Sequence, residues 1–413
     1  MSKLEELTNE ASAIRKDISV IAEQGGRTSL DELIQQYCPD GVEYVILSNI
    51  ATIKRGERVT KSQLDPNGQY PVISGGVKPL GLLNKYNREA NVITIAQYGT
   101  AGYIDWQYKK FWANDVCYSI YPNQEITNRY LYYALLNKQE LIYSLKTNAI
   151  PACLPIDKLS IIEIPVPPLP VQEEIVRILD KFTELQAELQ AELQKRKQQY
   201  NYYLDNLLKF NGGGHETEVK WMKLSEVASF TYGYTSKAQD LGDVRYIRIT
   251  DITDKGQLNP KNGKYISLTE DVMPYLLQKG DLIMARTGAT YGKTLYYNED
   301  YPSAYASFLI KITLNQSVDS KYYWHFTRSS IYWEQANRLV GGGAQPQFNT
   351  GAISQVKIPI PPLEEQKRIA DILDRFDRLT NDLSSGLPAE MEKRRQQYEY
   401  YRDRLLTFKR KEA

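Results

Sequence analysis

The chain has 413 residues, of which 24% are charged and 42% hydrophobic, and its formal net charge is only +1. This length gives room for two or three domains with sizeable cores. A net charge this small neither selects nor excludes nucleic acid as a partner. No apolar run reaches the roughly 18 residues of a membrane helix, and Met1–Glu6 lacks the hydrophobic region of a signal peptide, so we expect a cytoplasmic protein. The 3 scattered cysteines and 2 histidines predict neither a disulfide framework nor a metal site.

The first 41 residues form a helical segment. Apolar residues at alternating spacings of three and four over residues 4–21 predict a helix that ends at Gly25-Gly26. Ser29 and Glu32 then form a capping box, which predicts a short helix through Tyr37.

Two longer stretches, about 42 to 165 and 217 to 358, differ from this segment in composition. Both consist of short runs rich in β-branched and aromatic residues, broken by glycine, which are typical of strands. The expected strands of the first stretch are Tyr44–Leu47, Tyr70–Ile73, Asn91–Ala96, Val116–Tyr121 and Ile161–Ile164, with a helix at Asn128–Ser144. Those of the second are Arg245–Ile249, Asp281–Ala285, Ser307–Thr313 and Val356–Ile360, with a helix near Ser320–Leu339.

Short sequence matches in the same order align these two bodies. The first body contains Leu47-Ser48, Ile50-Ala51, Gly56, Ala96 and Gly99, and the second has Leu224-Ser225, Val227-Ala228, Gly233, Ala285 and Gly288 in the same order. The framework therefore repeats, whereas the loops differ. Asn211–Gly214 is predicted to be a flexible joint before the second body.

A much stronger repeat follows each body. Ile164–Leu169, Ile-Pro-Val-Pro-Pro-Leu, returns as Ile358–Leu363, Ile-Pro-Ile-Pro-Pro-Leu, and the Ile-Leu-Asp of residues 178–180 returns at 372–374, at a constant offset of 194. Further on, Arg196–Tyr200 matches Arg394–Tyr398 at an offset of 198. A repeat of this length indicates that the chain contains two copies of one structural unit.

Each repeat predicts a long helix. Prolines prevent a helix before Pro170, which itself can occupy the first helical position. Apolar residues from Val171 to Leu189 then form a narrow stripe at spacings of 4-3-4-3-4. One such stripe could lie on its own body or pair with another helix, but two copies in one chain favour pairing with each other. We expect the two helices to be antiparallel, with the bodies at opposite ends, and the second to bend or restart at Ser384–Pro388.

The sequence therefore predicts an α+β fold: two similar mixed α/β bodies separated by two long antiparallel coiled-coil helices, with a pseudo-twofold internal repeat. We place the boundaries at 1–41 for the N-terminal helical segment, 42–165 for the first body, 166–211 for the central helix, 212–358 for the second body and 359–413 for the C-terminal helix.

Each body has a small basic excess, with 13 lysines and arginines against 10 acids in residues 42–165 and 16 against 13 in residues 217–358. A solvated surface would explain this excess by itself. Its placement in glycine- and tyrosine-rich loops favours nucleic acid, because such loops combine phosphate-binding and base-reading side chains. The candidate DNA-binding residues are Lys54, Arg55, Arg58, Lys61, Gln97, Tyr98, Tyr234, Thr235, Ser236, Lys237, Arg286, Thr287, Tyr291 and Lys293.

Motifs for catalysis are missing. The segment Gly288–Thr294 looks like a phosphate-binding loop, but it has three residues between its glycines where that loop needs four. The sequence has no His-Glu-x-x-His and no Gly-x-Ser-x-Gly, and both Pro-Pro pairs continue into leucine rather than an aromatic residue. We expect a chain that is not an enzyme and binds no cofactor or metal.

The alternation of loop-rich bodies with like helices, together with Cys38–Tyr44, resembles the specificity subunit of type I restriction-modification systems. The most specific parts are Ile-Pro-x-Pro-Pro-Leu with the following Gln and Ile-Leu-Asp in both copies, and the loops Gly233–Lys237 and Ala285–Lys293. The first body departs from this pattern, because Gly56–Lys61 is one residue longer and Ala96–Gly102 lacks the arginine.

The resemblance implies that each body is a target recognition domain for one half of a bipartite site on double-stranded DNA. It also implies that the helices act as a spacer and dock two modification subunits, which use S-adenosylmethionine to methylate adenine. Restriction subunits driven by ATP with Mg²⁺ can join such a complex, and no membrane is involved. Two alternatives stay open: a coiled-coil adaptor with two protein-binding bodies, and a stand-alone DNA methyltransferase or nuclease.

Overall fold

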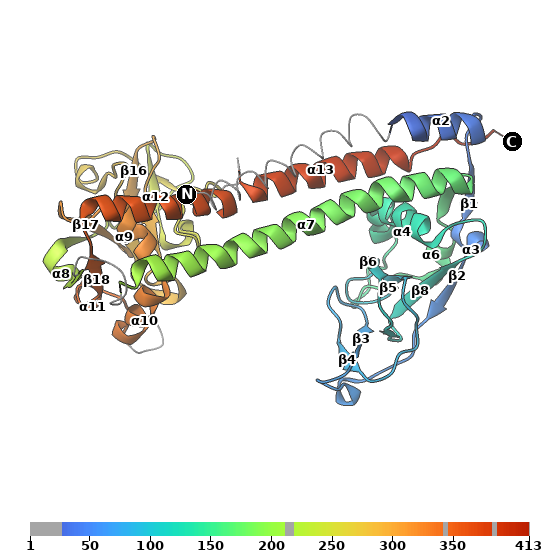
Figure 1. Ribbon diagram of the computed structural model, residues 1–413, viewed down its shortest axis with the longest axis horizontal. Helices are drawn as coiled ribbons and strands as arrows, with labels where there is room; N and C mark the ends of the chain where they lie inside the picture. Colours follow the sequence, from blue (N-terminus) through green and yellow to red (C-terminus); the bar gives the residue numbers. More distant parts are fainter. Residues whose placement is uncertain (1–26, 211–218, 342–345, 382–385, 413) are drawn as a thin grey trace. The chain divides into compact units, whose positions relative to one another are not determined.

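The computed structural model describes residues 27–210, 219–341, 346–381 and 386–412 (Figure 1). It divides into two compact units, Met1–Glu188 with Met391–Ala413, and Leu189–Glu390. Each unit contains one body and parts of both long helical regions. The helix expected over residues 4–21 lies outside the described residues.

The first body contains three small sheets. Their strand orders are β1-β9, β2-β8-β5-β6 and β4-β3-β7. The strands are β1 (Glu43–Ile46), β2 (Ala51–Arg55), β3 (Tyr70–Ile73), β4 (Gly81–Leu83), β5 (Val92–Ala96), β6 (Ile104–Gln107), β7 (Trp112–Ala113), β8 (Cys117–Pro122) and β9 (Glu163–Val166). The helices are α3 (Leu47–Ile50), α4 (Asn128–Asn137), α5 (Gln139–Ser144) and α6 (Ile156–Ser160), preceded by α2 (Arg27–Tyr37).

The second body repeats this topology strand for strand. Its sheets have the orders β10-β18, β11-β17-β14-β15 and β13-β12-β16. The strands are β10 (Lys220–Lys223), β11 (Ala228–Tyr232), β12 (Val244–Ile247), β13 (Tyr265–Ile266), β14 (Leu282–Ala285), β15 (Thr294–Tyr296), β16 (Ser303–Tyr305), β17 (Leu309–Leu314) and β18 (Lys357–Ile360). The helices are α8 (Leu224–Val227), α9 (Ser320–Phe326), α10 (Ser330–Leu339) and α11 (Thr350–Ile353). Even the pairing directions agree, since β3–β7 and β12–β16 are both parallel.

Three element predictions need correction. The helices expected as continuous at 128–144 and 320–339 are each divided, into α4 with α5 and α9 with α10. In the second case Ser329 caps a new helix by accepting the N–H of Tyr332, which starts α10. The capping box at Ser29 and Glu32 was wrong, because α2 already includes Arg27 and Ser29 therefore lies inside the helix.

The long helices α7 (Leu169–Leu208) and α12 (Leu363–Asn381) start in the same way on their own bodies. The buried side chain of Gln172 donates to Pro167 O (2.8 Å) and Glu125 O (3.0 Å) and accepts the N–H of Thr127 (2.8 Å). Gln366 makes the equivalent three bonds, to Pro361 O (2.8 Å), Ser317 O (2.9 Å) and the N–H of Asp319 (2.8 Å). Each glutamine therefore fixes the direction in which its helix leaves the body.

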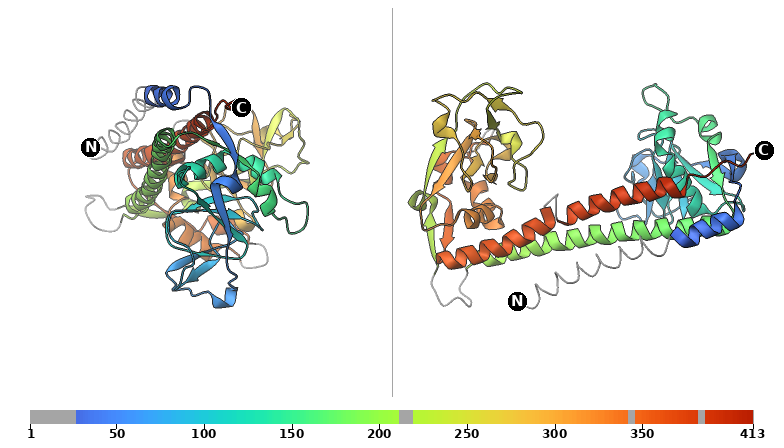
Figure 2. Two further views of the ribbon diagram at one scale, coloured as in Figure 1. Left: turned by 90° about the vertical axis from the view of Figure 1, so that its right-hand side faces the viewer. Right: turned by 90° about the horizontal axis from the view of Figure 1, so that it is seen from above.

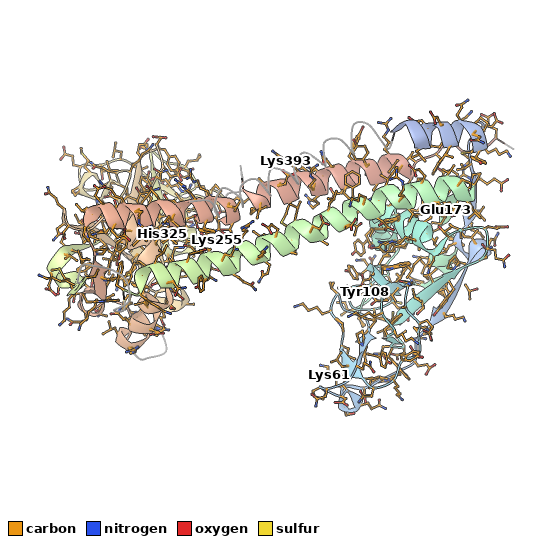
Figure 3. The ribbon with its side chains drawn as sticks, in the orientation of Figure 1. Lys61, Tyr108, Glu173, Lys255, His325 and Lys393 are labelled. Carbon is orange, nitrogen blue, oxygen red and sulfur yellow. The ribbon has the colours of Figure 1, made fainter. Side chains whose placement is uncertain are left out.

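An aspartate two turns further along each helix is held differently in the two units. Asp180 accepts from Tyr133 (2.5 Å) and Arg129 (2.7 Å). Asp374 is hydrogen-bonded instead to Nε2 of His325 (2.9 Å) and to Lys321. His325 is fully buried next to α12 (Figure 3), and its Nδ1 lies 3.4 Å from the hydroxyl oxygen of Tyr200.

The apolar stripe on the long helices has two roles. In the first turns of α7, Val171, Ile175 and Leu179 belong to the core of the first body, beside α4 and β5. Similarly, Ile369 and Leu373 of α12 are buried, and α12 packs against α9. Both alternatives weighed from the sequence therefore apply, to different turns of the same helix.

Beyond these turns the helices pair with each other. In the first unit the beginning of α7 lies beside the end of α13 (Leu387–Leu405; Figures 1 and 2). There Phe182 stacks on Tyr401. In the second unit the end of α7 meets α12, and Tyr203 stacks on Phe376. The pairing is antiparallel, as expected. The second helix also restarts, because Gly386 is not helical and α13 begins at Leu387; Ser384 and Ser385 lie outside the described residues.

Candidate nucleic-acid interface

Two loops of the first body meet at one end of its four-stranded sheet. β2 ends at Arg55 and β5 ends at Ala96, and these strands pair with opposite edges of β8. The N–H of Gly56 donates to Cys117 O (3.0 Å), and the N–H of Gln97 donates to Val116 O (2.8 Å). The candidate residues that follow β2 and β5 are therefore brought together at the start of β8.

The second body brings the equivalent loops together. β11 ends at Tyr232 and β14 ends at Ala285, and both strands pair with β17. The N–H of Gly233 donates to Leu309 O (3.1 Å), and the N–H of Arg286 donates to Phe308 O (3.1 Å). The two bodies thus present the same pair of loops on the same scaffold.

Glycine is required where each first loop begins. A Cβ on Gly56 would lie 2.1 Å from Asn114 O, and a Cβ on Gly233 would lie 2.2 Å from Ala306 O. Both contacts involve backbone atoms that cannot move aside easily. The sequence echo between these glycines therefore marks the same close approach of two chain segments in both bodies.

The basic candidates of the first body are exposed. Arg55 donates from Nε to Asp115 O (2.6 Å), and Nζ of Lys54 lies 5.0 Å from the ring centroid of Tyr121. Arg58 and Lys61 are also exposed, and Lys61 lies at the end of this body that is remote from α7 (Figure 3). All four cations are thus accessible at the surface of the first body.

Gln97 and Tyr98 are less exposed than these four cations. The Oε1 atom of Gln97 is buried and has no hydrogen-bond partner among the described residues. A hydrogen bond with the side chain of Cys153 raises the pKa of Tyr98. Burial raises the pKa of the Cys117 thiol to about 12, so this cysteine stays protonated behind the loop.

The candidate residues after β11 are of two kinds: some are exposed, and one packs against the body and supports the loop. Thr235, Ser236 and Lys237 are exposed. The ring of Tyr234 packs against that of Tyr275, with centroids 5.3 Å apart, and its carbonyl accepts from the Tyr246 hydroxyl (2.7 Å). Tyr234 therefore supports its loop from within.

The candidate residues in the loop after β14 also differ in exposure and in their partners. Thr287 is only 2% exposed, so its side chain does not reach the surface. Tyr291 donates to Oδ1 of Asn337 (2.6 Å), and Lys293 forms an ion pair with Asp254. Arg286 is only partly buried, and its side chain lies against the exposed rings of Tyr232 and Phe308.

Sequence reasoning missed a group of lysine–tyrosine pairs in the first body. Tyr108 is 71% exposed beside Lys109, and Nζ of Lys110 lies 4.3 Å from the ring centroid of Tyr86. A hydrogen bond with the Tyr86 hydroxyl raises the pKa of Lys110. The run Tyr108-Lys109-Lys110 could have revealed them, since aromatic rings next to cations suit both bases and phosphates.

The described part of the chain contains no group of three or more His, Cys, Asp or Glu side chains that could hold a metal ion. Among the same residues, no helix is long and apolar enough to cross a membrane. All three cysteines are free thiols, and those of Cys38 and Cys117 are buried.

Two relatives match almost the whole length of the chain. A putative type I restriction enzyme specificity subunit of Haemophilus influenzae is 32% identical, over 93% of this chain and 100% of that protein. A type I restriction enzyme specificity subunit of Escherichia coli is 33% identical, over 90% of this chain and 96% of that protein.

Solved structures share the fold. The S subunit of a type I restriction-modification system from M. genitalium superposes with a TM-score of 0.60 at 18% identity, covering 89% of this chain and 96% of that chain. A structure from work on complex assembly and conformational transition of the type I R-M system gives 0.58 at 15% identity, with 89% and 97% covered. The model of the type I restriction modification DNA specificity domain matches twice, at residues 39–196 and 216–393, and the chain therefore belongs to this family, with two copies of its specificity domain.

Proposed function

We propose that each body recognises one half of a bipartite site on double-stranded DNA, through the loops after β2 and β5 in the first body and after β11 and β14 in the second. The observation that carries this proposal is the repeated convergence of two loops on one strand, β8 or β17. A constant scaffold with variable loops suits recognition of two different sequences.

The paired helices serve as the spacer between the half-sites and dock two modification subunits. The exposed faces of α12 and α13 are mostly charged, and that of α7 mixes charged with uncharged polar side chains, so a docked protein would meet a polar surface there. We assign methylation with S-adenosylmethionine, and cleavage driven by ATP with Mg²⁺, to the modification and restriction subunits. This chain is then a non-catalytic recognition subunit that acts on DNA in the cytoplasm.

The test is DNA binding by the chain in complex with its modification subunits. Duplexes selected from a randomised pool should share two defined half-sites separated by an undefined gap, and binding should weaken as salt is raised. Selection of a single continuous site, or none, would contradict the proposal. Binding of S-adenosylmethionine by the purified chain alone would revive the methyltransferase alternative, whereas salt-insensitive, sequence-independent behaviour would favour the adaptor.

A further inference from the structure

The main chain of Arg286 is fixed on both sides at the end of the four-stranded sheet. Its N–H donates to Phe308 O (3.1 Å), and its carbonyl accepts the N–H of Phe348 (2.8 Å). The preceding residue, Ala285, is paired within β14 and fully buried. The side chain of Arg286 therefore leaves the sheet from a rigid position, which gives a binding group a defined place.

The guanidinium group is also held. Its Cζ lies 5.2 Å from the ring centroid of Tyr232 and 5.5 Å from that of Phe308, and its Nε donates to Ser307 O (3.1 Å). The hydroxyl oxygen of Tyr232 lies 3.2 Å from Oγ1 of Thr350, which fixes this ring in turn. One edge of the guanidinium thus faces the protein. Neither Nη1 nor Nη2 has a hydrogen-bond partner among the described residues.

Two rings that hold this group are themselves unusually exposed. Tyr232 is 43% exposed and Phe308 is 52% exposed, although both side chains are large and largely apolar. They form, with Arg286, a small platform at the end of the sheet where the loops of the second body converge. Such a platform favours a flat or planar ligand edge over a solvated ion.

A fixed pair of outward N–H donors matches a ligand with two adjacent acceptors. In the major groove, guanine presents its N7 and O6 atoms as such a pair. Phosphate also offers two acceptors, but a lysine can bind it as a point charge, so a phosphate contact does not require a fixed fork. Resting on the function proposed above, we propose that Arg286 reads a guanine in the half-site of the second body, and that Tyr232 and Phe308 position it.

The first body has a different residue at the equivalent place. Gln97 directly follows β5 as Arg286 follows β14, and each donates its N–H to the segment before the central strand. The glutamine has no guanidinium, so the first body has no equivalent of the Arg286 contact at this position. Gln97 is therefore a matched control for any change made at Arg286.

The experiment selects duplexes from a randomised pool with the complete complex of this chain and its modification subunits. For Arg286→Ala, one guanine of the second half-site should become degenerate, with preference at that base pair reduced roughly 5- to 150-fold. The remaining positions of both half-sites should persist, which shows that the variant is folded. Gln97→Ala should keep that guanine. Tyr232→Leu, which retains the arginine but removes one ring, should weaken the same preference.

Three results would overturn the assignment. The first is an unchanged consensus with weaker binding to all sequences and a salt slope reduced by about one, as expected for a phosphate contact. The second is loss of the whole second half-site in both Arg286→Ala and Arg286→Met, since the methionine keeps an apolar stem between the rings and only a structural role would then remain. The third is a wild-type second half-site without guanine. A wild-type complex that selects no bipartite consensus refutes the proposed function itself.

Discussion

Phe182 stacks on Tyr401 with ring centroids 5.4 Å apart and an interplanar angle of 27°. The equivalent residues of the other repeat copy form the second stack, in which Tyr203 lies 5.3 Å from Phe376 at 26°. In each unit an early residue of one helix thus meets a late residue of the other. Each copy of the repeat therefore contributes one ring to each stack.

Each stack should contribute a measurable coupling energy. In a double-mutant cycle, Phe182→Ala and Tyr401→Ala should show a coupling of about 0.5–1.5 kcal/mol in the free energy of unfolding of their unit. The pair Phe182→Ala and Tyr203→Ala is the control, because these rings belong to different stacks and their effects should add. Additive effects for the first pair as well would mean that the rings do not interact in solution.

The buried glutamines should be sensitive to loss of their amides. Gln366→Leu keeps an apolar side chain of similar size but leaves Pro361 O, Ser317 O and the N–H of Asp319 unsatisfied. We expect a loss of about 2–4 kcal/mol in stability, measured by denaturant unfolding. Lys367→Ala, one residue along and exposed, should cost less than about 0.5 kcal/mol. Equal effects of both changes would contradict this account of how α12 is anchored.

The stability of the second unit should depend on His325 at mildly acidic pH. Burial lowers the pKa of His325 below its ordinary 6.5, although its bond to Asp374 works in the opposite direction. The groups around it are Asp374 and Asp377 on α12, Lys321 and Arg328 beside it, and Tyr200 on α7. Below about pH 6.5 the unfolded chain binds a proton that the buried imidazole does not, so stability is complete above this pH and falls as the pH decreases.

Chemical denaturation between pH 7.5 and pH 5, as approximate limits set by the histidine range, checks this. The variant His325→Gln can still donate to Asp374 and does not titrate, so its stability should fall less than that of the wild type over this range. His215, which lies outside the described residues, is present in the wild type and in the variant. Its contribution therefore cancels when the pH dependences of the two stabilities are compared. Below pH 4 both should weaken together: burial opposes ionisation of Asp374, but bonds from His325 and Lys321 outweigh it and lower the pKa of this carboxyl from 3.8.

Arg58 should act on affinity without changing the sequence recognised. It is an exposed cation of the first body, in the segment that follows Gly56. If it meets a phosphate, Arg58→Ala lowers the affinity for all duplexes alike and reduces the salt slope by about one. Glu57→Gln, at the neighbouring exposed residue, is a control that should not weaken binding. A changed first half-site would identify Arg58 as a base contact instead.

The length of α7 should determine the gap between the half-sites. Residues 183–194 contain three tandem four-residue units, Thr-Glu-Leu-Gln and two copies of Ala-Glu-Leu-Gln, within this continuous helix. One unit adds about 6 Å and turns the helix about 40° beyond a full turn, whereas one base pair advances about 3.4 Å and turns about 35°. The rotations match for one base pair, and small shifts along the DNA axis can be absorbed by bending. The rotation of the helix, rather than its rise, should therefore set the number of base pairs in the gap.

Deleting Ala187–Gln190 moves Leu193 into the place of Leu189, so the buried stripe of α7 is kept. Methylated sites mapped in a host that carries the deletion with its partner subunits should then show a spacer shorter by about one base pair, with both half-sites unchanged. Glu188→Ala with Gln190→Ala changes the same exposed face without changing the length and should leave the spacer alone. An unchanged spacer in the deletion would refute this role of the helix.

Local patterns carried most of the fold prediction. The prolines before α7 and the apolar spacing after them are short-range signals, so the long helices and their antiparallel pairing were predicted correctly. The strands β3 and β5 were also found, because each is a compact β-rich run. Short strands such as β7 and β16 were missed, since two or three residues have no period and depend on a partner strand far along the chain.

The candidate interface was predictable at the level of loops but not of side chains. The equivalence of Gly56 with Gly233 correctly aligned the two scaffolds. Thr287 forms a backbone bridge with Gln347 and Lys293 an ion pair with Asp254, and both partners come from distant segments. No spacing rule connects such residues. The rings around Arg286 are likewise separated from it by 54 and 22 positions in the sequence.

The strand pairs β1–β9 and β10–β18 bring the two ends of each body together, with Glu43 opposite Val166 and Lys220 opposite Ile360. A segment whose ends are neighbours can be replaced as a whole without moving the helices to which it is attached. Genetic exchange between two related genes at these ribbons would therefore produce a folded chain with one inherited and one foreign body. Sequence preference could then change in a single recombination event, while every surface that the helices offer to other proteins is passed on intact.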